Sequence, residues 1–421
     1  MSSDQGGAHE GRETHQGSSQ PIVPPPPLSI PYAEFVALLA MLMAMTALSI
    51  DIMLPVLPEI AKAFGITTRN DQQLVIGSYL GGLALGQLLW GSVSDRLGRK
   101  GPLLFGLGVF MLGGIAAVWV SSFEHLTAAR FLQGFGGAAA RIVAVAVIRD
   151  HFSGRQMARV LSTVMMVFIL VPVLAPSIGQ AAAGLGSWRT TFHVLIGVGA
   201  LAIVWAGLRL PETHDRTRTR LGAFASLRLV FTTRVTVAYA IAAGFMFGCL
   251  VTYISSAQQV FVDVFGLGTW FPVVFGAIAS AIAVASFGNS RLVQRIGMRR
   301  LSHSALVAFT VVATTLAILA ETAQPPLVVV APLLAACFFL FGVIQPNFNA
   351  IAMHPVGQAA GTAASLIGAY TTAAGAIFGT LIARQFDGSV LPLSAGFALL
   401  GICALLTVFA VEGRSGMFRG E

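Results

Sequence analysis

Asp51 is an acidic residue near the end of an apolar run. A carboxylate inside a membrane helix costs about 2.5–3.5 kcal/mol on insertion scales, so such an acid tends to be functional or paired. It avoids this cost by binding a proton, because burial disfavours the charged form. We therefore predict that Asp51 is protonated reversibly, unless it lies in the outer interface before Pro55 and caps the chain. Glu34 is the second acid to consider, although its position beside Tyr32 favours the opposite membrane interface.

Two arginines form the matching cationic pattern. Arg130 and Arg141 are eleven residues apart, which is about three helical turns, so both lie on nearly the same side of one helix. Cations aligned on a membrane helix should face a polar cavity rather than lipid. Gln133 belongs to the same group. Arg130 is expected at the depth of Asp51, where its charge would bias the protonation of that acid and couple it to transport. A structural or snorkelling role remains open for Arg141.

Three further polar residues interrupt apolar segments, namely Tyr253, Asn347 and Asn349. They could present hydrogen-bonding groups to a substrate in an apolar cavity. Hydrogen bonds between neighbouring helices explain such residues equally well.

The composition identifies the elements that must carry these residues. Of the 421 residues, 56% are apolar and 10% are charged, against about 25% charged in soluble domains. A soluble domain and a fully disordered chain are therefore excluded. The three cysteines, Cys249, Cys337 and Cys403, lack metal or redox spacing and are interpreted as small buried apolar residues.

Apolar segments of about 20 residues recur along the chain, which is the length needed to cross a bilayer. They predict an all-α membrane protein with twelve spans, at residues 33–54, 73–94, 101–121, 125–148, 159–182, 191–210, 235–258, 270–290, 301–320, 327–353, 361–383 and 391–411. The expected organisation is a disordered tail (1–31), a six-helix half (32–210), a basic linker (211–234), a second six-helix half (235–411) and a tail (412–421).

The basic residues predict an orientation. With the N-terminus in the cytoplasm, 19 of the 25 lysines and arginines fall in the tails and the even-numbered connections. The odd-numbered connections hold four: Lys62, Arg69, Arg189 and Arg384. This asymmetry predicts that both termini are cytoplasmic. It also explains the net charge of +8 without nucleic acid.

An internal repeat supports two halves. Arg96 and Gly98 follow the second span, and Arg295 and Gly297 follow the eighth. The two arginines and the two glycines are separated by the same number of residues. The same offset aligns the first span with the seventh and the fourth with the tenth. A parallel repeat of this kind is typical of transporters with a central site between the halves.

The most specific string is Gly91-Ser92-Val93-Ser94-Asp95-Arg96-Leu97-Gly98-Arg99-Lys100 between the second and third spans. Gly91 permits close helix contact, and Gly98 suits a tight turn. Asp95 is the only acid among the cations Arg96, Arg99 and Lys100, so charge-assisted hydrogen bonds are expected. Positive-inside topology alone would explain the cations but not the glycines and the acid.

This string resembles the signature loop of the major facilitator superfamily of twelve-helix transporters. Further segments are similar to the bicyclomycin- and chloramphenicol-resistance branch of its drug:proton antiporters. They are Asp51-Ile52-Met53-Leu54-Pro55, Arg130-Phe131-Leu132-Gln133-Gly134, Arg149-Asp150 and Leu210-Pro211-Glu212-Thr213. The resemblance covers roughly residues 33–411 and implies that Gly91 to Lys100 form a cytoplasmic gating motif.

The fifth span carries a helix motif resembling that of antiporters, with Pro172, Pro176 and Gly179. It departs from the family pattern at Ala175 and Gln180, where glycines often stand. In the second-half copy of the signature loop, Gln294 replaces the acid and Met298 an arginine.

Other function classes lack support in the sequence. No G-x-x-x-x-G-K-[ST] loop, H-E-x-x-H pair, cysteine-rich metal spacing or nucleophile elbow occurs, so no enzyme, nucleotide, metal or cofactor is expected. We predict a monomer in the bacterial cytoplasmic membrane that exports small, fairly apolar compounds in exchange for protons, with lipid as its surroundings. A proton symporter or uniporter of a small metabolite is the alternative, and a non-transporting sensor is a third.

Overall fold

The computed structural model describes residues 30–68, 70–152, 154–213 and 223–416, and within these ranges every regular element is helical. Twelve helices there are 20 to 31 residues long. They are α1 (Tyr32–Asp51), α3 (Leu74–Leu97), α4 (Lys100–Trp119), α5 (Phe123–His151), α6 (Gly154–Gly184), α7 (Arg189–Arg209), α9 (Arg234–Gln258), α10 (Phe271–Ile296), α11 (Met298–Thr322), α12 (Leu327–Met353), α13 (Ala360–Ala383) and α14 (Leu391–Gly416).

The long helices confirm the predicted fold class. Ten described stretches are long and apolar enough to cross a membrane; one of them, Leu327–Ala383, contains both α12 and α13, and a shorter apolar stretch, Leu170–Gly184, lies in α6. Helices suit these apolar segments because a helix satisfies its own backbone hydrogen bonds in lipid. The predicted spans match the twelve helices, with ends that differ by up to six residues.

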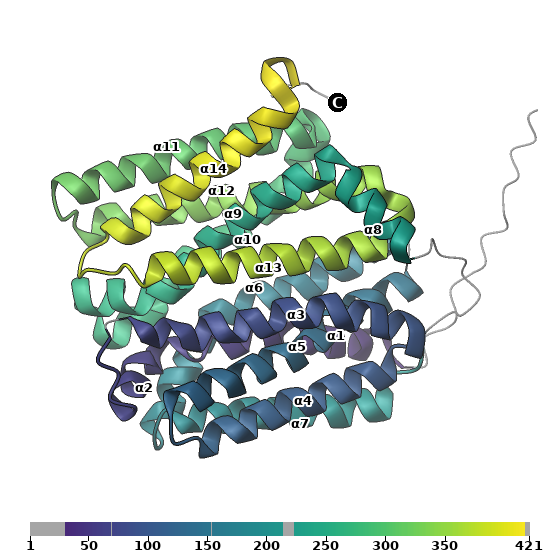
Figure 1. The fold of residues 1–421 in the computed structure, drawn as a ribbon, viewed down its shortest axis with the longest axis horizontal. Coiled ribbons are helices and arrows are strands. Elements are labelled where there is room, and N and C mark those ends of the chain that lie inside the picture. The colour runs from purple at the N-terminus through teal and green to yellow at the C-terminus, as the bar shows by residue number, and fades with distance from the viewer. Residues whose placement is uncertain (1–29, 69, 153, 214–222, 417–421) are drawn as a thin grey trace, which may run out of the picture.

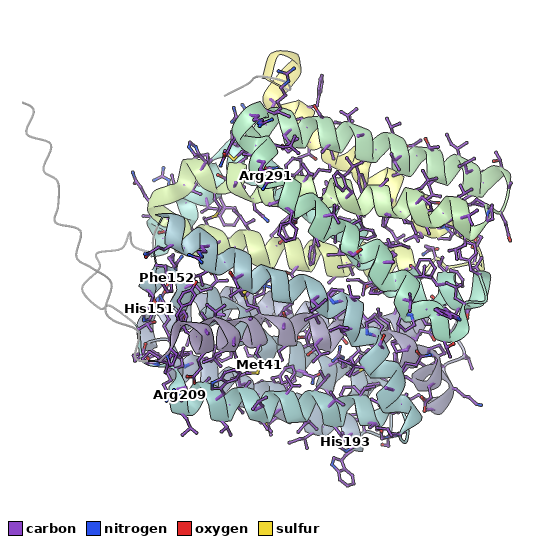
Figure 2. All side chains as sticks on the ribbon, turned by 180° about the vertical axis from the view of Figure 1, so that it is seen from behind. Met41, His151, Phe152, His193, Arg209 and Arg291 are labelled. Carbon is purple, nitrogen blue, oxygen red and sulfur yellow. The ribbon has the colours of Figure 1, made fainter. Side chains whose placement is uncertain are left out.

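The helices form two groups that lie side by side (Figure 1). The first contains α1 to α7 and the second α9 to α14, and they meet where α3 contacts α13 and α6 contacts α10. We call the end of the bundle that carries α8 and the start of α4 the basic end. The end that carries α2 is the opposite end. Figure 2 shows His151, Phe152 and Arg209 together at the basic end.

Two short helices were not predicted. α2 (Leu57–Ala63) continues the first span after a 3₁₀ turn at Leu54–Val56, where Pro55 interrupts the regular hydrogen bonding. α8 (Ala223–Thr232) lies within the expected linker. Residues 1–29 of the predicted disordered tail fall outside the described residues, as do residues 214–222 of the linker and Arg69.

One close helix crossing positions much of the site. A Cβ atom on Gly82 of α3 would lie 1.9 Å from the carbonyl oxygen of Phe131, and one on Gly134 of α5 would lie 1.9 Å from that of Tyr79. Only glycine fits at both positions. The crossing brings Tyr79 of α3 against Arg130 of α5.

Candidate functional site

Asp51 is the last residue of α1, and its side chain is buried in the bundle. The residue is 2% exposed, and Oδ1 has no hydrogen-bond partner among the described residues. Because a buried polar atom without a partner carries its full desolvation cost, the surroundings of this carboxyl do not stabilise its charge through hydrogen bonds to Oδ1. The feature is unusual enough to mark a functional position.

Asp51 faces the second half of the molecule. It is close enough to Tyr253 of α9 for an electrostatic interaction. The Tyr253 hydroxyl donates to the carbonyl oxygen of Phe275 at 3.1 Å, and its ring lies 5.0 Å from the ring of Phe275 and 4.6 Å from that of Phe338. The acid of the first half therefore approaches a buried aromatic cluster of the second.

Gly179 explains how α6 reaches the same place. A Cβ atom there would lie 2.2 Å from the carbonyl oxygen of Ile52, directly after Asp51. Pro172 and Pro176 lie inside α6 on the approach to this contact. The helix motif predicted from the sequence thus packs against the break at the end of α1.

Arg130 lies beside the last turn of α1, where its charged group contacts the main chain and not the Asp51 carboxyl. Its guanidinium donates to the Ser49 carbonyl at 2.8 Å, the Val75 carbonyl at 3.3 Å and Gln133 Oε1 at 2.5 Å. No ion pair joins Arg130 to Asp51 among the described residues. The carbonyls at a helix end lack intrahelical donors, which is why the last turn of α1 accepts from Arg130.

Tyr79 is a member of this cluster that the sequence did not reveal. The Arg130 guanidinium lies 4.5 Å from the centre of its ring, and Tyr79 interacts electrostatically with both Arg130 and Arg141. Arg141 is half-buried and has no hydrogen bond or ion pair within the described chain. One polar side of α5 therefore contains Arg130, Gln133 and Arg141, with Tyr79 beside it.

The two asparagines of α12 differ. Asn347 is buried and donates to Asn289 Oδ1 of α10 and to the Val343 carbonyl, both at 2.8 Å. The bond to Asn289 is a helix-to-helix hydrogen bond of the kind that was the alternative interpretation, whereas the bond to Val343 lies within α12. Asn349 is half-buried and forms no hydrogen bond within the described chain. Neither is in a described contact with Asp51.

Glu34 lies at the basic end, far along α1 from Asp51. Arg209 donates to both of its carboxylate oxygens at 2.7 Å, and Trp205 donates to Oε1 at 3.2 Å. This bidentate pair favours a fixed, charged Glu34. It matches the interfacial interpretation.

A second cluster surrounds the signature loop at the basic end. Arg99 is fully buried and donates to Asp95 Oδ1 at 2.6 Å and to Asp150 Oδ2 at 2.8 Å. Burial opposes its charge, but these hydrogen bonds and the attraction of both carboxylates outweigh burial and raise the pKa of Arg99. Arg99 therefore stays cationic and links α3 to α5.

Glu212 completes the charged cluster. It accepts hydrogen bonds from the backbone N–H groups of Arg99 at 2.7 Å and Lys100 at 3.1 Å, at the start of α4. Gly98 has a φ of 97°, and a Cβ atom there would lie 2.7 Å from Glu212 Oε2. Arg96 is exposed and has no described hydrogen bond or ion pair. The string Gly91 to Lys100 thus contains both a buried core and a solvent-facing cation.

The charged cluster touches the second half at the start of α13. Asp95 Oδ2 and the Arg149 guanidinium both lie within 4 Å of where a Cβ atom on Gly361 would be. A Cβ atom on Gly91 would lie 2.4 Å from Ser365 Oγ. The N-terminus of a helix attracts an acid, so the placement of Asp95 is electrostatically favourable.

Buried amides join the two halves at the opposite end; we call these residues the amide cluster. Asn70 donates to the carbonyls of Arg384 and Phe386 at 2.9 and 2.8 Å. Gln259 donates to Asn70 Oδ1, and Gln73 donates to Gln259 Oε1, both at 2.6 Å. Asn70 adopts a left-handed backbone with φ of 75°. The sequence analysis missed this cluster, although amides placed directly before a membrane span were a usable signal.

The described residues contain no cluster of three or more His, Cys, Asp or Glu side chains that could hold a metal ion. The side chains gathered here are the carboxyl of Asp51, the polar groups of α5 and the buried aromatic cluster around Tyr253.

Comparisons with known proteins agree with this architecture. The sequence profile of the Major Facilitator Superfamily matches residues 39–380. The chain is 33% identical over 385 residues to the bicyclomycin resistance protein homolog of Haemophilus influenzae, covering 89% of this chain and 94% of that protein. It is 26% identical to the multidrug resistance protein MdtL of Klebsiella pneumoniae, covering 86% and 90% of the two chains.

The solved structure of a D-xylose-proton symporter shares the fold, with a TM-score of 0.72 at 15% identity, covering 89% of this chain and 96% of that one. The protein is therefore a multi-pass inner-membrane transporter and not an enzyme. It belongs to the Major Facilitator Superfamily, in the group that includes the Haemophilus bicyclomycin resistance protein homolog.

Proposed function

We propose that this transporter exports small, fairly apolar compounds in exchange for protons. The observation that carries the proposal is Asp51, a buried acid whose Oδ1 lacks a hydrogen bond at the boundary between the halves. Such a carboxyl is cheaper to bury when neutral and becomes stable as an anion only when water or a cation reaches it. A change in access would therefore load or release its proton.

The proposed substrate class rests on the surroundings of Tyr253, which interacts with Asp51. Tyr253, Phe275 and Phe338 form a buried aromatic cluster, which a substrate would contact only once the halves have moved apart. Apolar compounds gain free energy by leaving water for such a surface. Two relatives are named for bicyclomycin resistance and multidrug resistance, which supports export of drug-like compounds.

Arg130 has a positioning role in this proposal. It binds the main chain of α1 at Ser49, two residues before Asp51, and also holds α3 at Val75. A shift of α5 against α1 would therefore move the backbone that carries Asp51. Such a shift couples to protonation only if the proton affinity of Asp51 differs between the two conformations.

We further propose that the basic end faces the cytoplasm. By the helix bounds, the arginines of that end precede α4, close α5 and α7, and lie in α8 and at the start of α9: Arg99, Arg149, Arg209, Arg228 and Arg234. Basic residues are retained on the cytoplasmic side. Protons would then reach Asp51 from the outside, and substrate would enter from the cytoplasm.

Flux across proteoliposomes tests the mechanism. We would impose a pH gradient, add bicyclomycin or an apolar dye, and follow proton and compound movement together. Opposite movement of proton and compound supports antiport, movement of both in one direction indicates symport, and compound flux without proton movement indicates uniport. If the wild-type protein makes cells resistant to a compound but moves none of that compound in proteoliposomes, export is contradicted.

Asp51→Asn isolates the proton step. We expect uphill export to fall by at least tenfold while ligand binding is retained, because the amide cannot bind and release a proton. Glu34→Gln makes the same chemical change in the other acid of α1 and should keep the pH dependence of export. Uphill export by Asp51→Asn with an unchanged pH profile would place the proton on another residue.

A further inference from the structure

A groove of about 620 Å³ opens on the membrane-facing side of the seam between the halves. Its walls are α3, α9 and α13, and α8 closes it at the basic end (Figure 1). Apart from Thr236 and Tyr370, its lining residues are apolar or glycine. The Thr236 hydroxyl donates to the Ala352 carbonyl, so it is already used. The groove therefore suits a hydrocarbon chain.

Two cations lie next to this groove. Arg228 precedes the lining residue Phe231 by three positions in α8, and Arg234 precedes the lining residue Val237 by three positions in α9. Residues three apart lie on the same side of a helix. Both arginines are exposed, and no acidic side chain pairs with either one within the described chain. A positive surface thus adjoins the closed end of an apolar groove.

We propose that the groove binds one anionic phospholipid from the leaflet at the basic end. The phosphate accepts hydrogen bonds from Arg228 and Arg234, and an acyl chain lies between α3 and α13. Arginine suits this role because its planar guanidinium matches the geometry of a phosphate. Anionic headgroups are attracted to clustered basic residues at the membrane surface.

The membrane, rather than water, is the source of the occupant. Leu85, Leu88 and Ile377 line the groove and are exposed on the surface of the bundle, where lipid surrounds the helices. A bound chain would contact α3 of the first half and α9 and α13 of the second. The lipid would therefore favour the conformation in which this seam is closed, since a ligand stabilises the state it binds.

Binding is measured on the detergent-purified full chain by native mass spectrometry, with dioleoyl phosphatidylglycerol and dioleoyl phosphatidylcholine titrated separately. We expect the wild type to retain one phosphatidylglycerol more tightly than phosphatidylcholine and to melt at a higher temperature with it. Arg228→Gln with Arg234→Gln should weaken phosphatidylglycerol binding about 25-fold, since each arginine near an anionic headgroup contributes about fivefold. Phosphatidylcholine binding should stay the same.

Matched variants separate a site from general adhesion. Arg291→Gln removes an exposed arginine at the same end, away from the groove (Figure 2), and should leave phosphatidylglycerol binding intact. Ala373→Trp fills the groove and should weaken both lipids, whereas Leu406→Trp on the lipid-facing surface of α14 should weaken neither. The proposal would be overturned if Arg291→Gln weakened phosphatidylglycerol binding as much as the double arginine variant does. It would also be overturned if Ala373→Trp left phosphatidylglycerol binding unchanged. These readouts need no transport, so they are independent of the proposed antiport.

Discussion

At the basic end of the α3–α13 seam the strongest polar contacts lie within one half, whereas at the opposite end they join the two halves. Arg99 binds Asp95 and Asp150 of its own half. The amide cluster instead connects residues that are far apart in the chain, including Asn70 and Gln259. Polar contacts therefore have different roles at the two ends. At the basic end they stabilise one half internally, and at the opposite end they hold the two halves together.

The difference has an energetic consequence. Opening the basic end would leave the ion pairs of Arg99 intact while separating Asp95, Arg149 and Gly91 from the start of α13. Opening the opposite end would break several hydrogen bonds between neutral groups, each with a net value of about 0.5–1.5 kcal/mol because water replaces them. Either step is small enough to be reversible.

A pair of cysteine reporters on α13 compares the two ends directly. Ser365→Cys lies beside Gly91 at the basic end, and Thr380→Cys lies beside Gly77 toward the opposite end. Both are introduced into a chain whose native cysteines, Cys249, Cys337 and Cys403, are replaced. The rate of labelling by a polar maleimide reports how open each end is.

The largest expected effect is that of Arg99→Gln. Removing the buried cation takes away the guanidinium that bridges Asp95 and Asp150, which should destabilise the protein by about 3–5 kcal/mol. Unfolding in mixed detergent micelles measures this change. Arg96→Gln alters the neighbouring exposed cation and should change stability by less than about 0.5 kcal/mol. Equal stability of the two variants would show that the buried pairs contribute nothing net.

Asp95→Asn should act on opening more than on folding. It weakens the attraction between this carboxyl and the start of α13, so labelling at Ser365→Cys should rise several-fold and flux should fall about tenfold. Labelling at Thr380→Cys should stay low. Wild-type flux with unchanged labelling would remove Asp95 from the gating mechanism.

Asn70→Gly is expected to have the opposite pattern. Glycine keeps the left-handed backbone but loses the three side-chain hydrogen bonds, so stability should fall by about 1–3 kcal/mol. Labelling at Thr380→Cys should increase, and labelling at Ser365→Cys should not. Faster labelling at both reporters would mean that the ends do not open independently.

The smallest effect should come from Asp71→Asn. Asp71 pairs with Arg384 across the opposite end, but both side chains are partly exposed. Such pairs contribute up to about 1 kcal/mol and are weakened by salt. We therefore expect a slight rise in Thr380→Cys labelling that disappears in 1 M salt. If Asp71→Asn increased labelling at Thr380→Cys as much as Asn70→Gly does, the opposite end would be held closed by this ion pair rather than by the amide cluster.

The sequence predicted the parts of the molecule that depend on local hydropathy. Twelve spans follow from apolar runs, and the buried acid and arginines stand out because charge is rare there. Two of the three hydrogen-bond acceptors of Arg130 could not be predicted, since they are backbone carbonyls selected by the depth at which α5 crosses α1 and α3. The bonds of Asn70 with Gln259 and with Arg384 depend on how the two halves dock, which no local pattern encodes. α8 was missed because its ten residues are too short to resemble a span.

The segment containing α8 also joins the two halves covalently. A tether of this length keeps the surfaces of α3 and α13 at an effective local concentration on the order of millimolar, even when they separate. The halves therefore need no affinity comparable to that of two free proteins. Contacts of a few kcal/mol suffice to close either end, and such weak closure leaves room for a proton or a small apolar compound to shift the balance.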